Sequence, residues 1–196
     1  MSKLLNNIFM VVITAYTLAG CTTAPETDSS AHETKPAAKA IPLYESAITL
    51  AKAGQDKQAL EQFSLMTRQY PKVAIGYTNV GLLQLKSGNL ELAAQAFKQA
   101  VILDPRDKIA LNHHGVVQRR QGAFDKARQS YLQALKIDGN YAEAHLNLGI
   151  LYDIYLQELP LALKHYQRFQ SLTDNSDQMV AKWIVDLQRR IPATKK

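Results

Sequence analysis

The sequence predicts an all-α protein, built as a solenoid of repeated helix hairpins. From about Ala40 onward, apolar residues recur at helical spacing, and glycine and proline separate the apolar segments. Four positions also recur at a step of thirty-four residues. They are Gly54, Gly88 and Gly122; Ala59, Ala93 and Ala127; Phe63, Phe97 and Tyr131; and Pro71 and Pro105. Because one hairpin cannot bury its apolar face alone, stacking of successive hairpins must supply the core.

These positions resemble the tetratricopeptide repeat (TPR), which has this period and the pattern W-x2-L-G-x2-Y, A-x3-F and P. The second repeat carries the pattern best, with Tyr77, Gly81, Ala93 and Phe97, whereas the first has Ala47 where glycine is usual. The resemblance implies a right-handed superhelical solenoid of about four hairpins. We place them at about residues 40–73, 74–107, 108–141 and 142–175.

The first twenty residues have the form of a secretory signal peptide. Lys3 precedes an apolar stretch from Ile8 to Ala19, which suits a signal core and falls short of the ~20 residues that span a bilayer. The single cysteine of the chain follows, and residues 18–21, LAGC, resemble a bacterial lipobox. That resemblance implies cleavage after residue 20 and acylation of Cys21. The alternative is an ordinary secretory signal with an incidental cysteine.

Residues 21–39 are predicted to be a lipidated cysteine followed by a disordered tether. The segment TTAPETDSSAHETKPAAK has no large apolar residue, so burial cannot offset the entropy of ordering it. Several acyl chains on Cys21 would anchor the protein stably to a membrane. Thr22, and not an aspartate, follows the cysteine. By resemblance to lipoprotein sorting rules, this indicates an outer-membrane lipoprotein that faces the periplasm.

Within the repeats, glycine in the first helix of a hairpin is expected to allow close approach of the second helix. These glycines are Gly81, Gly115 and Gly149. An aromatic residue at the position of Phe97 should fill the space between neighbouring hairpins. In the fourth repeat the alanine of the A-x3-F pattern, Ala162, comes one residue later than the period of thirty-four requires. We therefore expect a one-residue insertion within residues 154–160.

Residues 176–191 are expected to form a helix that caps the last hairpin. Its apolar residues form one stripe, and its charged residues fall largely on the other side. The stripe consists of Met179, Val180, Trp183, Ile184, Leu187 and Ile191. We expect both Phe97 and Trp183 to be buried; the alternative for this helix is that it docks a partner. A basic tail, residues 192–196, follows.

Binding is predicted on the first helices of the hairpins, which in TPR proteins line a concave groove for a peptide or a helix. Asn79 and Asn147 lie two periods apart, and an amide can both donate to and accept from a peptide backbone. The alternative is a hydrogen bond within their own hairpin. Arg119 and Arg120 can bind carboxylates, unless they are only a solvated basic helix end. The full predicted groove is Tyr44, Lys52, Asn79, Lys86, Asn112, His113, Arg119, Arg120, Asn147 and Asp153.

The sequence offers no catalytic, metal or cofactor site. His113 and His114 are adjacent on an expected helix and therefore point to different sides, which makes them a poor metal pair. We expect His114 and His145 to be packing residues and His165 to face solvent. Neither a Gly-rich phosphate loop nor a serine-glycine elbow is present. We therefore expect no enzymatic activity, no cofactor and no small-molecule substrate.

The formal net charge of +6 favours anionic partners, such as an acidic peptide, lipid headgroups or cell-wall polymer. A basic chain can bind nucleic acid, but an export signal argues against that. We therefore predict a lipid-anchored scaffold or assembly factor of the cell envelope, which binds acidic or extended segments of other envelope proteins. Alternatives are a pilotin for a type IV pilus secretin, an adaptor for cell-wall enzymes, and an accessory subunit of a TonB/ExbB-type energy-transducing complex.

Overall fold

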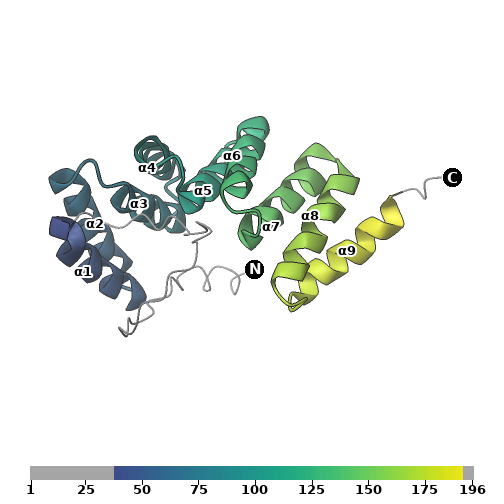
Figure 1. The fold of residues 1–196 in the computed structure, drawn as a ribbon, viewed down its shortest axis with the longest axis horizontal. Coiled ribbons are helices and arrows are strands. Elements are labelled where there is room, and N and C mark those ends of the chain that lie inside the picture. Colours follow the sequence, from purple (N-terminus) through teal and green to yellow (C-terminus); the bar gives the residue numbers. More distant parts are fainter. Residues whose placement is uncertain (1–37, 192–196) are drawn as a thin grey trace, which may run out of the picture.

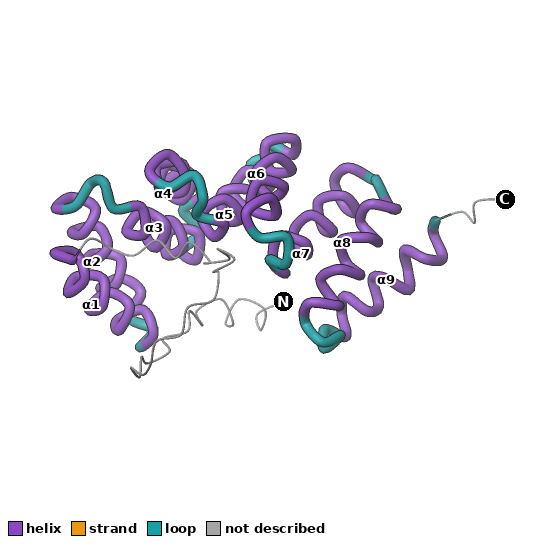
Figure 2. The backbone as a smooth tube through the Cα atoms, in the orientation of Figure 1, coloured by secondary structure: helices purple, strands orange, loops and turns teal. Residues whose placement is uncertain are grey.

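In the computed structural model, residues 38–191 form a series of helices joined by short loops (Figure 2). The expected signal peptide, the acylated Cys21, most of the tether and the basic tail lie outside these described residues. A short 3-10 turn, Ala38–Ala40, precedes the helices α1 (Ile41–Lys52), α2 (Asp56–Gln69), α3 (Ala74–Lys86), α4 (Leu90–Leu103), α5 (Lys108–Arg120), α6 (Phe124–Ile137), α7 (Ala142–Ile150), the π-helical η2 (Leu151–Leu156), α8 (Leu159–Leu172) and α9 (Gln178–Arg190). In this part of the chain, none of the helices has the length and apolar character needed to cross a bilayer.

Consecutive helices pack as hairpins, and the hairpins stack into an arc (Figure 1). The hairpins are α1 with α2, α3 with α4, α5 with α6, and α7 with α8. Helices α3, α5 and α7 follow the inner side of the arc, and α4 and α6 follow its outer side. Helix α9 packs against α8 at one end. The predicted all-α solenoid is therefore confirmed.

In three of the hairpins, a glycine in the first helix and an aromatic ring in the second allow the two helices to pack closely. A Cβ atom placed on Gly81 would lie 2.7 Å from the ring of Phe97, which is fully buried. The same contact is made by Gly115 with Tyr131 and by Gly149 with Tyr166. The predicted close approach of the two helices is therefore confirmed.

The fourth hairpin contains the insertion that the late alanine predicted. In the earlier hairpins a glycine with positive φ makes the turn after the first helix. These are Gly54, Gly88 and Gly122. In the fourth hairpin Gln157 takes this position with a φ of 55°, and its amide donates to the carbonyls of Asp153 and Ile154 at 2.6 and 3.3 Å. The preceding segment, η2, is π-helical, and a π-helix uses more residues per turn than an α-helix, so η2 takes up the extra residue.

Polar side chains tie successive hairpins together. The Thr78 hydroxyl on α3 donates to the Asp107 carboxylate at 2.6 Å, and both residues are buried. Asp107 also caps α5 by accepting two backbone N–H groups at the start of that helix, each at 2.9 Å. Lys108 pairs with Asp138 at 2.6 Å, and this hydrogen bond holds the pKa of Asp138 below its usual value. These contacts fix how the third hairpin sits between its neighbours.

Helix α9 covers the apolar side of the last hairpin. Val180 and Leu187 are buried, and the Trp183 ring packs on Tyr166 with 5.3 Å between the ring centres. Phe97 is fully buried as predicted, but Trp183 is only half-buried. The difference arises because Trp183 lies on the last helix of the described stack, where one side of the ring faces solvent.

Candidate protein-binding face

Basic residues recur at equivalent ends of the first helices. Lys52, Lys86 and Arg120 lie thirty-four residues apart, in the last turns of α1, α3 and α5. Arg119 adds a second cation to the last turn of α5. Cations are favourable there because a helix C-terminus carries partial negative charge. The fold therefore brings the predicted basic positions to one edge of the inner layer.

At the α1 end of the arc, the predicted groove residues Lys52 and Lys86 differ in their availability to a partner. Lys86 is engaged, because its ammonium pairs with Asp56 of α2 at 2.7 Å. Lys52 is exposed. Tyr44, also predicted for the groove, is half-buried and packs edge-on against Phe63, with 6.1 Å between the ring centres.

The arginines at the end of α5 have no carboxylate partner among the described residues. Arg119 donates through Nε to the Tyr131 hydroxyl at 3.4 Å, and its guanidinium lies 5.7 Å from the ring centre of Tyr155. Arg120 is exposed. Both charges therefore remain available to an anionic group of a partner.

Two consecutive apolar residues of η2 are exposed, and the second of them, Tyr155, lies beside Arg119. Ile154 is 59% exposed and Tyr155 is 41% exposed, and the Tyr155 ring lies 4.8 Å from the Phe124 ring. Tyr155 lies two residues before Gln157, the positive-φ residue of the fourth hairpin. In the earlier repeats the residue two positions before the positive-φ glycine is Lys52, Lys86 or Arg120. Sequence reasoning missed Ile154 and Tyr155, although this equivalence could have identified Tyr155. We call Arg119, Arg120, Phe124, Ile154 and Tyr155 the Arg119–Tyr155 patch.

The asparagines predicted for the groove are engaged inside the stack. Asn79 is largely buried, and its amide donates to the Ile75 carbonyl one turn earlier at 2.8 Å. Asn112 is 1% exposed and accepts from the Asn147 amide at 3.1 Å. Asn79 thus follows the alternative of a bond within its own hairpin, whereas Asn147 bonds across to α5. Their contact with a partner stays a prediction.

His113 is also buried, in a site that favours its neutral form. Its Nδ1–H donates to the Ile109 carbonyl at 3.0 Å, and its ring stacks on Phe97 with 5.8 Å between the centres. Burial lowers the pKa of His113 because the charged ring would lose its hydration. At neutral pH this side chain is therefore a packing residue that also satisfies a backbone carbonyl.

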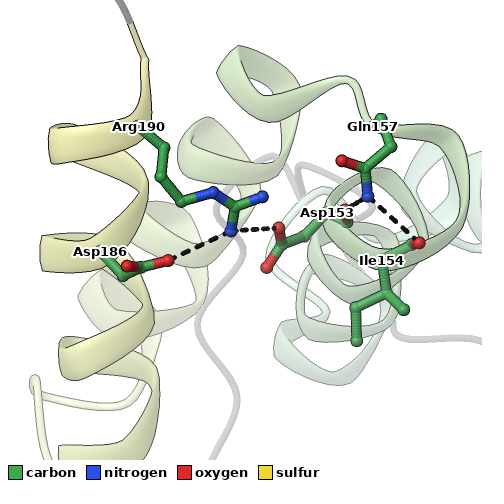
Figure 3. Close-up of polar contacts among 5 residues, drawn as sticks. All are labelled: Asp153, Ile154, Gln157, Asp186 and Arg190. Atoms are coloured by element: carbon green, nitrogen blue, oxygen red, sulfur yellow. Dashed lines mark hydrogen bonds and ion pairs between the residues drawn. The ribbon is translucent and has the colours of Figure 1, made fainter.

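Asp153 is already paired with the C-terminal helix (Figure 3). Arg190 Nη1 lies 3.3 Å from Asp153 Oδ1 and 3.1 Å from Asp186 Oδ2. Burial and the nearby Asp153 carboxylate raise the pKa of the Tyr166 hydroxyl. Only 15% of the Asp153 side chain is exposed. Asp153 therefore fastens α9 to η2, through an arginine that the sequence analysis did not single out.

The described residues contain no group of three side chains that could hold a metal ion. The histidines that meet are His145 on α7 and His165 on α8, whose Nδ1 atoms are 2.9 Å apart. His165 is half-buried, which corrects the expectation that it faces solvent. The close packing of α7 on α8 through Gly149 brings the two rings together.

A family model described as tetratricopeptide repeat matches residues 78–142 and again residues 114–177, which together make up half of the chain. The chain belongs to the tetratricopeptide repeat family. TPR and related solenoids use their long curved surfaces for binding, which agrees with a protein-interaction scaffold for this TPR chain. No curated protein matches the sequence.

Solved structures share the fold of this TPR chain at low sequence identity. MamA 41-end from Desulfovibrio magneticus RS-1 is 17% identical with a TM-score of 0.68, over 80% of this chain and 87% of that one. PilF of Pseudomonas aeruginosa is 19% identical with a TM-score of 0.69, over 77% and 68%. The first TPR of Spaghetti (RPAP3), bound to the HSP90 peptide SRMEEVD, is 19% identical with a TM-score of 0.56, over 60% and 91%.

Proposed function

We propose that this TPR protein is a non-enzymatic, lipid-anchored scaffold of the bacterial cell envelope, and that it binds an acidic peptide or helix of a partner protein at the Arg119–Tyr155 patch. The observation that carries the proposal is the combination of two cations without a carboxylate partner among the described residues and a half-exposed aromatic ring at their side. Arginine and tyrosine are enriched at the centres of protein interfaces.

The charge and shape of the patch support an acidic ligand. Arg119 is held in place by Tyr131 and Tyr155, so less side-chain entropy is lost when it binds a carboxylate. Ile154, which precedes Tyr155 in the chain, is also exposed and offers an apolar contact. The acidic peptide SRMEEVD bound by the Spaghetti TPR is an example of such a ligand on the same fold.

The lipid anchor rests on the sequence of the first twenty-one residues, in which a short apolar core is followed by LAGC. Acylated Cys21 would hold the solenoid at a membrane through residues 22–39. Fractionation of cells and mass spectrometry of the mature protein test this part. Wild type should float with membranes and carry acyl chains, and Cys21→Ser should be released; a soluble wild-type protein with a free thiol would end the proposal of an anchor.

The binding face is tested by site-specific photo-cross-linking in cells, with the cross-linker at Tyr155. The matched control places it at Ile102, which is 61% exposed and belongs to α4, a helix of the outer side of the arc. We expect a discrete adduct from Tyr155 that disappears in Arg119→Glu with Arg120→Glu and weakens as salt rises.

Arg120→Glu alone is the second variant, because Arg120 is exposed and its replacement should leave the melting temperature unchanged. Equal adducts from Tyr155 and Ile102, or adducts that persist in both arginine variants, would show that the patch is not the working surface. The identity of the cross-linked protein then decides between pilus assembly, cell-wall synthesis and energy transduction.

A further inference from the structure

The fourth hairpin carries a hollow lined by basic and polar side chains. It has a volume of about 450 Å3 and is bounded by α7 and α8. Its lining consists of His145, Lys164, His165, Gln167, Arg168 and Ser171. No carboxylate is among these residues, and none of them belongs to the Arg119–Tyr155 patch.

Two cations in the hollow lack a counter-ion among the described residues. Arg168 donates to Asn140 Oδ1 at 2.5 Å and to Ser171 Oγ at 3.4 Å. Both partners are neutral, so they orient the guanidinium without cancelling its charge. Lys164 makes no ion pair within the described part of the chain. By contrast, Arg128 on α6 has carboxylate partners from two segments.

The histidine pair can supply a third donor. His145 Nε2–H donates to the Gly139 carbonyl at 3.1 Å, so Nδ1 of the neutral ring is left to accept. His165 Nδ1 lies 2.9 Å from that atom and must therefore be the donor. The free nitrogen of His165 is then Nε2, which can take up a proton without breaking the pair.

The charged groups around the pair are mainly positive. Lys164 and Arg168 on α8 are the positive groups. The negative group is Asp138, which precedes α7 and whose carboxylate pairs with Lys108 at 2.6 Å. The Tyr152 ring of η2 is uncharged and stacks on the His165 ring, with 5.6 Å between the ring centres. Burial, His145 and Lys164 lower the pKa of His165 to about 4. His165 is therefore neutral at pH 7, and an anion in the hollow would oppose the effect of these cations.

We propose that this hollow binds a tetrahedral oxyanion, a phosphate or sulfate group, between Lys164, Arg168 and His165, and that His165 takes up a proton on binding. The guanidinium presents paired N–H donors to such a group, and Lys164 adds a point charge. Free phosphate and the phosphate of an anionic lipid headgroup offer the same chemistry. The two sources are separated by the test.

The test is a titration of the full chain with sodium sulfate at constant ionic strength, followed by the NMR signals of the His165 ring and the Arg168 side chain. Sulfate does not change its charge near neutral pH, so any pH effect belongs to the protein. We expect saturable shifts, with an affinity that rises as the pH is lowered from about 7.5 to about 5.5. His165→Gln should remove this pH dependence, and Lys164→Gln with Arg168→Gln should weaken binding about tenfold or more.

The matched control is Lys57→Gln with Arg68→Gln, which removes two exposed cations from α2. Absence of a saturable shift, or an equal loss in this control, would overturn the proposal, as would a pH dependence that persists in His165→Gln.

Flotation with vesicles, all with Cys21→Ser so that no acyl chain contributes, identifies the source of the anion. Binding to phosphatidylglycerol vesicles over phosphatidylcholine vesicles, lost in Lys164→Gln with Arg168→Gln, assigns a headgroup. Sulfate binding without such flotation assigns a free anion.

Discussion

At the scale of single residues, space is most restricted at the glycines of the first helices. In Gly115→Ala the new Cβ would lie 2.6 Å from the Tyr131 ring, and that ring is fully buried and cannot move away. Overpacking of this kind costs about 1–3 kcal/mol, and the gain in helix propensity from alanine offsets only ~1 kcal/mol of it. We therefore expect Gly115→Ala to lower the free energy of unfolding by up to about 2 kcal/mol in urea denaturation.

Gly139→Ala is the matched control for this prediction. A Cβ on Gly139 would meet only the Leu135 carbonyl oxygen, at 3.8 Å, so the change should stay within about 0.5 kcal/mol of wild type. If Gly115→Ala proved as stable as Gly139→Ala, the close approach of α5 and α6 would not be a constraint on the sequence.

The residue types at the repeat positions were predictable from the period of the repeat. The hydrogen-bond partners of the polar side chains were not. The glycine and aromatic positions follow from a step of thirty-four residues. Burial of Asn79 and Asn112 does not, because it depends on the hydrogen-bond partner of each side chain: Asn79 donates to the Ile75 backbone carbonyl, and Asn112 accepts from the Asn147 amide. The exposure of Tyr155 likewise depends on how η2 turns the chain, which a linear pattern does not contain.

At the scale of helices, two aspartates that make the same N-terminal cap start α5 and α9 in different surroundings. Both Asp107 and Asp177 accept two backbone N–H groups at about 2.9–3.0 Å. Asp107 is also buried and accepts from Thr78 at 2.6 Å. Loss of the cap alone costs about 1 kcal/mol, and loss of the hydrogen bond from Thr78 to a charged carboxylate adds about 1.5–3 kcal/mol, since Thr78 then keeps only its contact with the Ala74 carbonyl at 3.4 Å.

Asp107→Ala should therefore lower the free energy of unfolding by about 2–4 kcal/mol, and Asp177→Ala by about 1 kcal/mol. Urea denaturation of the two variants provides the comparison. Equal losses would mean that the Thr78–Asp107 bond contributes nothing to the stacking of the second hairpin on the third.

The position of the insertion in the fourth repeat was predictable, but its conformation was not. The shifted position of Ala162 indicates that one extra residue is present, but it does not indicate where the helix widens. The structure places that widening in η2, where Gln157 closes the turn with positive φ. The same element carries Tyr155, whose ring lies beside Arg119 and Phe124, so the least regular element contributes to the candidate site.

For the molecule as a whole, stability should fall as the solution becomes mildly acidic. Burial lowers the pKa of every histidine that the structure describes, and these are His113, His114, His145 and His165. The unfolded chain, with histidines near their usual pKa of about 6.5, then binds more protons than the folded chain below that pH. Stability is therefore fully present above about pH 6.5 and falls as pH decreases below it.

Urea denaturation at about pH 7.5, 6.5 and 5.5 measures this effect. The pKa of Asp138 is lowered, so its contribution is lost only below its ordinary carboxylate range and does not interfere. The decrease should be smaller in His113→Gln, which removes one of the groups. A free energy of unfolding that stays constant or rises between about pH 7.5 and 5.5 would contradict the neutral state assigned to these rings.

Because each hairpin contacts only its neighbours, a packing defect should loosen the stack locally before it unfolds the whole. Phe97 is fully buried in the second hairpin, and Phe97→Ala should cost about 3–5 kcal/mol. Trp183 is half-buried on the last described helix, so Trp183→Ala should cost less. Hydrogen exchange should therefore increase from α1 to α6 in Phe97→Ala, but only from α7 to α9 in Trp183→Ala. Faster exchange in α3 on truncating Trp183 would require coupling along the full arc, which nearest-neighbour packing does not provide.

If α9 exchanged freely in the wild-type protein, it would not act as a cap, and the pairing of Arg190 with Asp153 would be too weak to hold it on η2.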